Sequence, residues 1–142
     1  MATVFTKIID GELPGRFVWR DEHAVAFLSI NPLTTGHVLV VPVAEVDHWI
    51  DLDAGVWAHL NEVVRAVGQA VDRAFDCARV GTVIAGFEVP HVHVHVFPAK
   101  AMADFDFRNA AADPNSDEMD DAAAAIRRAL VDLGHDVVVS ET

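Results

Sequence analysis

Polar and apolar residues alternate most strictly over 91–97, where the chain reads His-Val-His-Val-His-Val-Phe between two prolines. Successive side chains of an extended strand point to opposite faces, so this alternation predicts a strand with three imidazoles on one face. The valines share the other face, where β-branched side chains pack well. Because imidazole has an unperturbed pKa of about 6.5, it serves as nucleophile or acid near neutral pH. The run therefore predicts a functional site.

Shorter patterns predict the other strands. Two strands are expected near 16–20 and 23–29, joined by a tight turn, and a third over 37–42. The third is apolar on both faces, which indicates a central position in the sheet. Residues 80–85 predict a fourth strand. The link from 86 to 90 is too short for a helical crossover, so the fourth strand and the histidine strand should pair antiparallel.

Apolar residues at three- and four-residue steps predict the helices. We expect a short helix over 3–10 and an amphipathic helix of about 20 residues from Asp53. After a loop over 99–115, Ser116 is the expected N-cap of a final helix, and Gly134 lies past its end. An antiparallel sheet with helices outside it is an α+β fold.

Length and composition restrict the class of protein. The 142 residues fit one domain, 1–142, with a core over about 3–98 and a C-terminal helical extension over about 99–142. Hydrophobic residues make up 52%, yet no run approaches the roughly 18–20 needed to span a bilayer, so we expect no membrane association. The N-terminus lacks a secretory pattern. The single cysteine suits a reducing compartment, so we expect the cytoplasm.

The net charge restricts the classes of partner that the protein can bind. A formal net charge of −12 argues against a nucleic-acid polymer, which requires clustered Lys and Arg, but leaves room for a small anion held by local donors. Much of the acid lies over 104–121. We interpret that patch as a solvated linker and helix start.

Three interpretations of the histidine run remain open. Same-face neighbours about 6.6 Å apart can chelate a metal as a pair, and His37 would complete a set with His93 and His95. The histidines can also be a wet polar face of a strand. Covalent catalysis fits best, because a neutral imidazole is a good nucleophile at phosphorus and His93 has an imidazole on either side.

The run His91–Phe97 resembles the signature of the histidine-triad (HIT) family of nucleotide hydrolases and transferases. Three further segments are similar to that family: Phe5–Pro14, Ala26–Pro32 and Gly36–Pro42. The resemblance covers about residues 3–98.

This resemblance implies a fold and an activity. The fold is a HIT-like antiparallel five-stranded sheet with a long helix and a C-terminal helix packed on it. The activity is cleavage of nucleoside 5′-phosphoramidates or dinucleoside polyphosphates through a nucleotidyl-histidine intermediate, with no cofactor, in a homodimer. The alternatives are a purine-nucleotide-binding protein with little turnover and a metal-binding protein that uses the histidine cluster.

The resemblance also implies roles for four histidines. His93 would be the nucleophile at the α-phosphorus. His95 would contact the phosphate or the leaving group, His91 would orient the nucleophile, and His37 would complete the polar wall.

Substrate-binding roles carry over to six residues, which are Phe27, Ser29, Ile30, Gly86, Phe87 and Glu88. Phe27 and Ile30 would line the base and ribose pocket, and Gly86 would let the backbone approach the substrate. Ser29 stands where relatives commonly have a ribose-binding Asp, which weakens or rebuilds ribose recognition. Phe87 stands where they have Gln, which removes a phosphate-contacting amide.

Two further positions bear on the anion and on metal. Glu88 precedes the triad, and a carboxylate there would repel polyphosphate. Thr3 and Thr6 occupy the places where many relatives hold zinc with a Cys-x-x-Cys pair, so the structural zinc should be absent.

Overall fold

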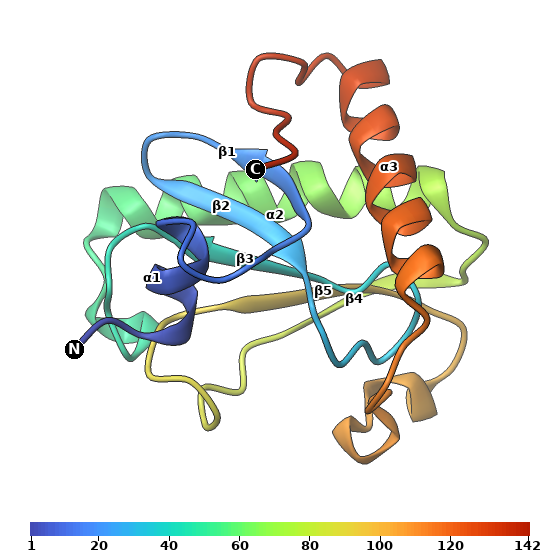
Figure 1. Cartoon of the computed structure of the whole chain (residues 1–142), viewed down its shortest axis with the longest axis horizontal. Coiled ribbons are helices and arrows are strands. Elements are labelled where there is room, and N and C mark those ends of the chain that lie inside the picture. The colour runs from blue at the N-terminus through green and yellow to red at the C-terminus, as the bar shows by residue number, and fades with distance from the viewer.

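A five-stranded antiparallel sheet runs through the middle of the computed structural model, which describes residues 1–142 (Figure 1). Its strands are β1 (Phe17–Arg20), β2 (Ala24–Leu28), β3 (Val38–Pro42), β4 (Arg79–Val83) and β5 (Val94–Ala99). Their order is β1-β2-β3-β5-β4, and every neighbouring pair is antiparallel. The expected α+β fold, the central third strand and the antiparallel pairing of the last two strands are all confirmed.

Helices cover both faces of this sheet, as Figure 1 shows. They are α1 (Val4–Ile9), α2 (Ala54–Ala74) and α3 (Ser116–Asp132), together with the short 3-10 turns η1 (Trp49–Asp51), η2 (Met102–Phe105) and η3 (Phe107–Asn109). The two 3-10 turns η2 and η3 lie within the stretch 99–115 that was expected to be a loop. No helix is both long enough and apolar enough to cross a bilayer.

The two faces of the sheet carry two separate hydrophobic clusters. The larger cluster of 22 buried residues joins one face of the sheet to α2 and α3 and contains all three valines of the histidine run. The smaller one, on the face toward α1, contains Phe5, Phe17, Val25, Phe27, Leu39 and Val41. The valines therefore face α2, and the histidines face α1.

The strand that carries the histidines is shorter at its start than expected. β5 begins at Val94, because the β3 ladder ends at the Val40–Val94 pair and β4 ends opposite His95. Before it, the Val92 N–H donates to the Val46 carbonyl, in the segment that follows β3. Residues 91–93 thus lie outside the ladder but keep the alternation of faces.

Helix caps explain where α2 and α3 begin. The Asp53 carboxylate accepts from the N–H groups of Gly55 and Val56, as expected for an N-cap. For α3 the expected cap was wrong by one residue. Asn115 accepts from the Glu118 N–H, while the Ser116 hydroxyl accepts from Arg16. Asn and Ser are equally good caps, so local preference alone does not choose between adjacent ones.

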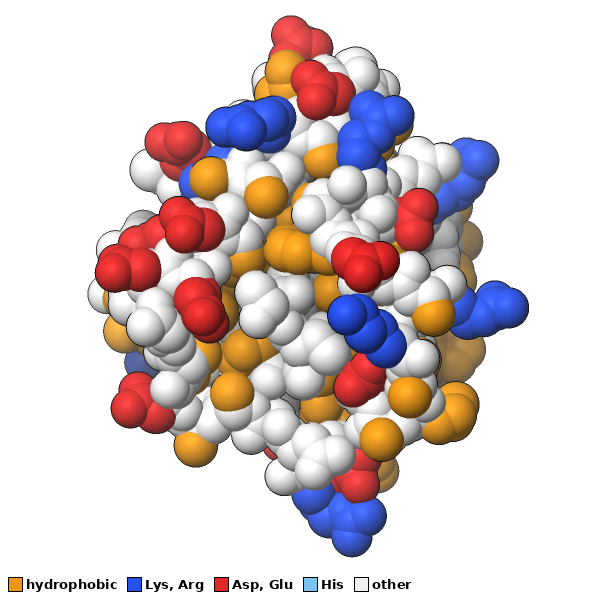
Figure 2. Space-filling view, turned by 90° about the vertical axis from the view of Figure 1, so that its right-hand side faces the viewer, with side chains coloured by type: hydrophobic (Ala, Val, Ile, Leu, Met, Phe, Trp, Pro, Cys, Tyr) orange, Lys and Arg blue, Asp and Glu red, His pale blue; other side chains and the backbone are white.

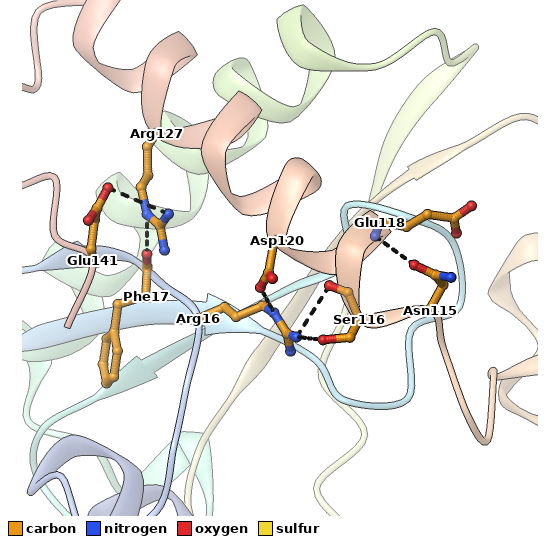
Figure 3. A network of polar contacts seen from close by, with 8 residues as sticks. All are labelled: Arg16, Phe17, Asn115, Ser116, Glu118, Asp120, Arg127 and Glu141. Carbon is orange, nitrogen blue, oxygen red and sulfur yellow. Dashed lines mark hydrogen bonds and ion pairs between the residues drawn. The ribbon is translucent and has the colours of Figure 1, made fainter.

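Polar contacts tie the C-terminal extension to the sheet (Figure 3). The Arg127 guanidinium donates to the Phe17 carbonyl at 2.7 Å, and Arg16 binds Asp120 at 2.8 Å. The acidic stretch is therefore more than a solvated linker. On the face seen in Figure 2, acidic side chains gather along the left, and basic side chains are scattered over the top, right and bottom.

Gly36 provides a test of how the loop before β3 packs against Phe75 at the end of α2. Its φ is +100°, and a Cβ there would lie 2.5 Å from the Phe75 ring. Gly36→Ala should therefore lower the free energy of unfolding by the left-handed backbone term of about 1–2 kcal/mol plus an overpacking term of about 1–3 kcal/mol. Gly134→Ala, at φ +95° with open space around it, should lose only the first. Urea unfolding measures both, and equal losses would contradict the packing.

Candidate active site

A cavity of about 710 Å³ opens between the sheet, α1 and the C-terminal extension. Three of the four histidines line it: His37, His93 and His95. Apolar side chains form its walls, among them Val4, Phe5, Ile8, Phe27 and Leu39. Its size and its mostly apolar lining with a few convergent polar groups are typical of a small-molecule site.

The His93 ring is oriented by a hydrogen bond to the main chain. Its Nδ1 lies 2.8 Å from the backbone carbonyl oxygen of His91, and a carbonyl can only accept a hydrogen bond. The proton of the neutral ring is therefore on Nδ1, and Nε2 keeps a free lone pair. The rings of Phe5 and His95 pack against the His93 ring in T-shaped arrangements, with centroids at 4.9 and 5.0 Å, and these contacts restrict its orientation.

His37 and His95 form a second, directional pair. The Leu33 N–H donates to His37 Nδ1 at 2.9 Å, so the proton of the neutral ring is on Nε2. That nitrogen lies 2.9 Å from His95 Nδ1 and donates to it. The remaining proton of His95 is then on its Nε2. Beside the lone pair of His93, the cavity thus gains an N–H donor.

Burial keeps both rings of this pair neutral. Desolvation lowers the pKa of His37 to about 3, with additional repulsion from His95 and His93. Desolvation, followed by repulsion from His93, lowers the pKa of His95 to about 4. Both tautomers are therefore present throughout the neutral pH range.

The His91 ring does not line the cavity. It is fully buried, with Nε2 2.8 Å from the Pro42 carbonyl and Nδ1 2.7 Å from the Thr3 hydroxyl. Burial lowers its pKa. The backbone carbonyl of His91, and not its ring, hydrogen-bonds to the His93 ring.

A hydrogen-bonded cluster fixes the start of α1 beside His91. One carboxylate oxygen of Glu45 accepts from the Thr3 N–H and the Thr6 hydroxyl, both at 2.7 Å. These hydrogen bonds, that from the Thr3 N–H foremost, lower the pKa of Glu45. The Thr3 hydroxyl also caps α1 by accepting from the Thr6 N–H. This cluster positions Phe5 against the His93 ring.

The hydrogen bonds disfavour the metal interpretation. In the neutral His37–His95 pair, the lone pair of His37 accepts from Leu33 and that of His95 Nδ1 accepts from His37. Thr3 and Thr6 offer hydroxyls, which are not among the usual ligands of zinc. No group of three or more His, Cys, Asp or Glu side chains is placed to hold a metal ion.

Four of the six expected substrate-binding residues line the cavity: Phe27, Ser29, Ile30 and Glu88. Gly86 and Phe87 do not, and the Phe87 side chain is 96% exposed. The chain turns at Gly86 through a positive φ of 78°, and it reaches the cavity again at Glu88 and Val89.

The extension adds wall residues that no sequence pattern indicated. They are Phe107, Ala110, Ala112 and Asp120. The Phe107 ring meets the His95 ring edge-on at 4.9 Å. These residues come together only through the path of the chain. In contrast, the apolar positions of the helix predicted over 3–10 could have indicated the part of the cavity wall that α1 forms.

Comparisons with known proteins point to one family. The family model described as HIT domain matches residues 10–102. The chain is 37% identical over 99 residues to an uncharacterized HIT-like protein of Methanocaldococcus jannaschii, which covers 67% of this chain and 77% of that protein. It is 38% identical over 92 residues to a bis(5′-nucleosyl)-tetraphosphatase (asymmetrical) of Schizosaccharomyces pombe, covering 61% of this chain but only 50% of the relative.

Solved structures extend the similarity to most of the chain. A zinc-bound histidine triad family protein from Mycobacterium smegmatis superposes with a TM-score of 0.80 at 25% identity, covering 94% of this chain and 96% of that one. A HIT-like protein from Bartonella henselae gives a TM-score of 0.78 at 25% identity, covering 89% and 95%.

The buried His37 predicts a characteristic loss of stability in acid. In the unfolded chain its ring takes up a proton below the ordinary histidine pKa of about 6.5, whereas the folded ring stays neutral until about pH 3. The free energy of unfolding should therefore fall as pH is lowered from 7 to 4, by up to about 3 kcal/mol for this residue. In His37→Gln that contribution disappears, so its stability difference from wild type should shrink toward pH 4.

Denaturant unfolding at a series of pH values measures this effect. His48→Gln is the matched control, because the His48 ring is exposed. A difference between His37→Gln and wild type that stays constant from pH 7 to pH 4 would contradict the neutral, buried state of His37.

Proposed function

Because this chain belongs to the HIT family, we propose that it is a nucleotide hydrolase or transferase that acts through a nucleotidyl intermediate on His93. Its substrates are nucleoside 5′-phosphoramidates or dinucleoside polyphosphates. The observation that carries the proposal is the contact of His93 Nδ1 with the His91 carbonyl, because it leaves Nε2 free for attack. The tetraphosphatase of S. pombe supports the substrate class.

In the first step, the lone pair of His93 Nε2 attacks the α-phosphorus and forms an N–P bond. The P–N or P–O bond to the leaving group breaks, and the leaving group departs with the electron pair and takes up a proton from water. The His93 ring becomes cationic, and its Nδ1–H then donates a charge-assisted hydrogen bond to the His91 carbonyl. The Nε2–H of His95 stabilises charge on a phosphoryl oxygen.

In the second step, water attacks the same phosphorus and the P–Nε2 bond breaks. The ring recovers its electron pair and returns to the neutral tautomer, a proton goes to solvent, and a nucleoside monophosphate is released. Another acceptor in place of water makes the reaction a transfer.

The apolar part of the cavity suits the nucleoside. Phe27, Ile8 and Leu39 offer flat and branched apolar surfaces for a base. The alternative of a nucleotide binder with little turnover depended on Ser29 and Phe87. Since Phe87 lies outside the cavity, only one of those two departures still bears on the site.

His93→Ala tests the covalent step. With adenosine 5′-phosphoramidate, the wild type should release AMP and show an adenylylated chain by intact mass after a rapid quench. His93→Ala should lose at least roughly 10³-fold in rate, as expected when a covalent nucleophile is removed, and show no adduct. His48→Ala, at an exposed histidine, should behave as wild type. Turnover that survives in His93→Ala would reject the mechanism.

We also propose that two copies pair through β4, in a cytoplasmic homodimer with no nucleic-acid partner. β4 is an edge strand that pairs only with β5, and the apolar Ile84 and Phe87 that follow it are exposed. Exposed edges and apolar side chains of this kind are typical of pairing surfaces.

Sedimentation equilibrium at micromolar concentration tests the dimer. Wild type should have twice the mass of one chain. Thr82→Lys places a charge on the exposed side of β4 and should shift the protein toward monomer. Thr142→Lys, at the opposite edge of the sheet beside Arg20 of β1, is the matched control and should stay dimeric. A monomeric wild type would refute the pairing.

A further inference from the structure

The C-terminal extension forms one wall of the cavity. The Ala111 N–H donates to the Pro32 carbonyl at 3.0 Å, and the Asn31 amide donates to the Ala111 carbonyl at 3.0 Å. These two hydrogen bonds hold the segment before α3 against the loop that follows β2. Most of this wall lies beyond residues 10–102, the part of the chain that matches the family.

An ion pair lies where this wall meets the entrance to β1. The Arg16 Nε donates to one oxygen of Asp120 at 2.8 Å, and its terminal nitrogen donates to the Ser116 hydroxyl at 3.0 Å (Figure 3). Both Arg16 and Asp120 line the cavity. The Asp120 side chain is 63% exposed, and its second oxygen, Oδ2, accepts no hydrogen bond. The guanidinium thus fixes a carboxylate that keeps a free acceptor.

Two other polar side chains in this part of the cavity are hydrogen-bonded within the chain. The Ser29 hydroxyl accepts from the Asn31 N–H, and the Asn31 amide is bound to Ala111. The acidic side chains of the lining are Glu88 and Asp120, and Glu88 belongs to the segment that leads into the triad, whereas Asp120 lies beside Arg16. A ribose presents two adjacent hydroxyl donors, and a carboxylate is the usual protein partner of such hydroxyls.

We propose that Asp120, oriented by Arg16, binds the ribose hydroxyls of the nucleotide, so that α3 completes the substrate site. The inference rests on the proposed function, because it presupposes that a nucleotide occupies the cavity. It assigns to a residue of the C-terminal helix the acceptor that Ser29 does not supply. Arg16 is a positioning residue in this arrangement.

The Arg16–Asp120 ion pair can be removed by mutation without unfolding the protein, because it contributes little to stability. An exposed ion pair contributes about 0–1 kcal/mol, so loss of Asp120 leaves the fold intact. The neighbouring Asp121 is also exposed on α3 and forms no ion pair, and it does not line the cavity. Asp121→Ala is therefore a control of the same size and charge.

The experiment compares AMP with its 2′,3′-dideoxy analogue by isothermal titration calorimetry. Wild type should bind AMP at least about tenfold more tightly than the analogue, which is the effect expected for hydrogen bonds to a charged acceptor. In Asp120→Ala this ratio should collapse toward one through weaker AMP binding, with analogue binding within about twofold of wild type. Asp121→Ala should keep the wild-type ratio, and Arg16→Gln should reduce it.

Two results would overturn the inference while nucleotide binding stands. Either the ratio in Asp120→Ala equals that of wild type, or AMP and the analogue weaken equally, which would mean a structural role or a contact with another part of the nucleotide. If wild type binds neither compound, the proposed function fails, and this inference fails with it.

Discussion

The site depends on the hydrogen bond that His93 Nδ1 donates to the backbone carbonyl of His91. A carbonyl accepts and never donates, so this contact selects one tautomer of the ring. It also ties the His93 ring to the main chain two residues away, in a segment where the N–H groups of His91 and Val92 bond outside the sheet ladder. A side-chain partner could turn away, but a carbonyl fixed by the backbone cannot.

The other histidines show how tautomers are set by what surrounds them. The Leu33 N–H donates a hydrogen bond to His37, and His37 donates one to His95. The Pro42 carbonyl accepts one from His91. Every side-chain nitrogen and oxygen that is shut off from solvent has a partner, and the unpaired Nε2 atoms of His93 and His95 belong to rings that line the cavity. Such a fully satisfied network is rigid, and a lone pair and a donor can be held side by side within it.

The walls of the cavity come from both ends of the chain. α1 packs Phe5 against His93, and the Thr3–Glu45 contacts hold that helix in place. The C-terminal extension places Phe107 against His95 and Asp120 beside Arg16. The sheet therefore supplies the chemistry, while the flanking segments shape what it can bind. Differences in those segments are where we expect related proteins to differ in substrate.

The alternation over 91–97 determined, by itself, that the valines enter the core and the histidines share the opposite face, because side-chain direction along an extended chain is a local property. The resemblance built on that run also identified the family and the fold. Only the tertiary structure decided that the His91 ring lies outside the cavity, that Phe87 faces solvent, and that Asp120 reaches Arg16 across 104 residues. Hydrogen-bond partners and cavity walls depend on how distant segments meet, and no local pattern encodes that path.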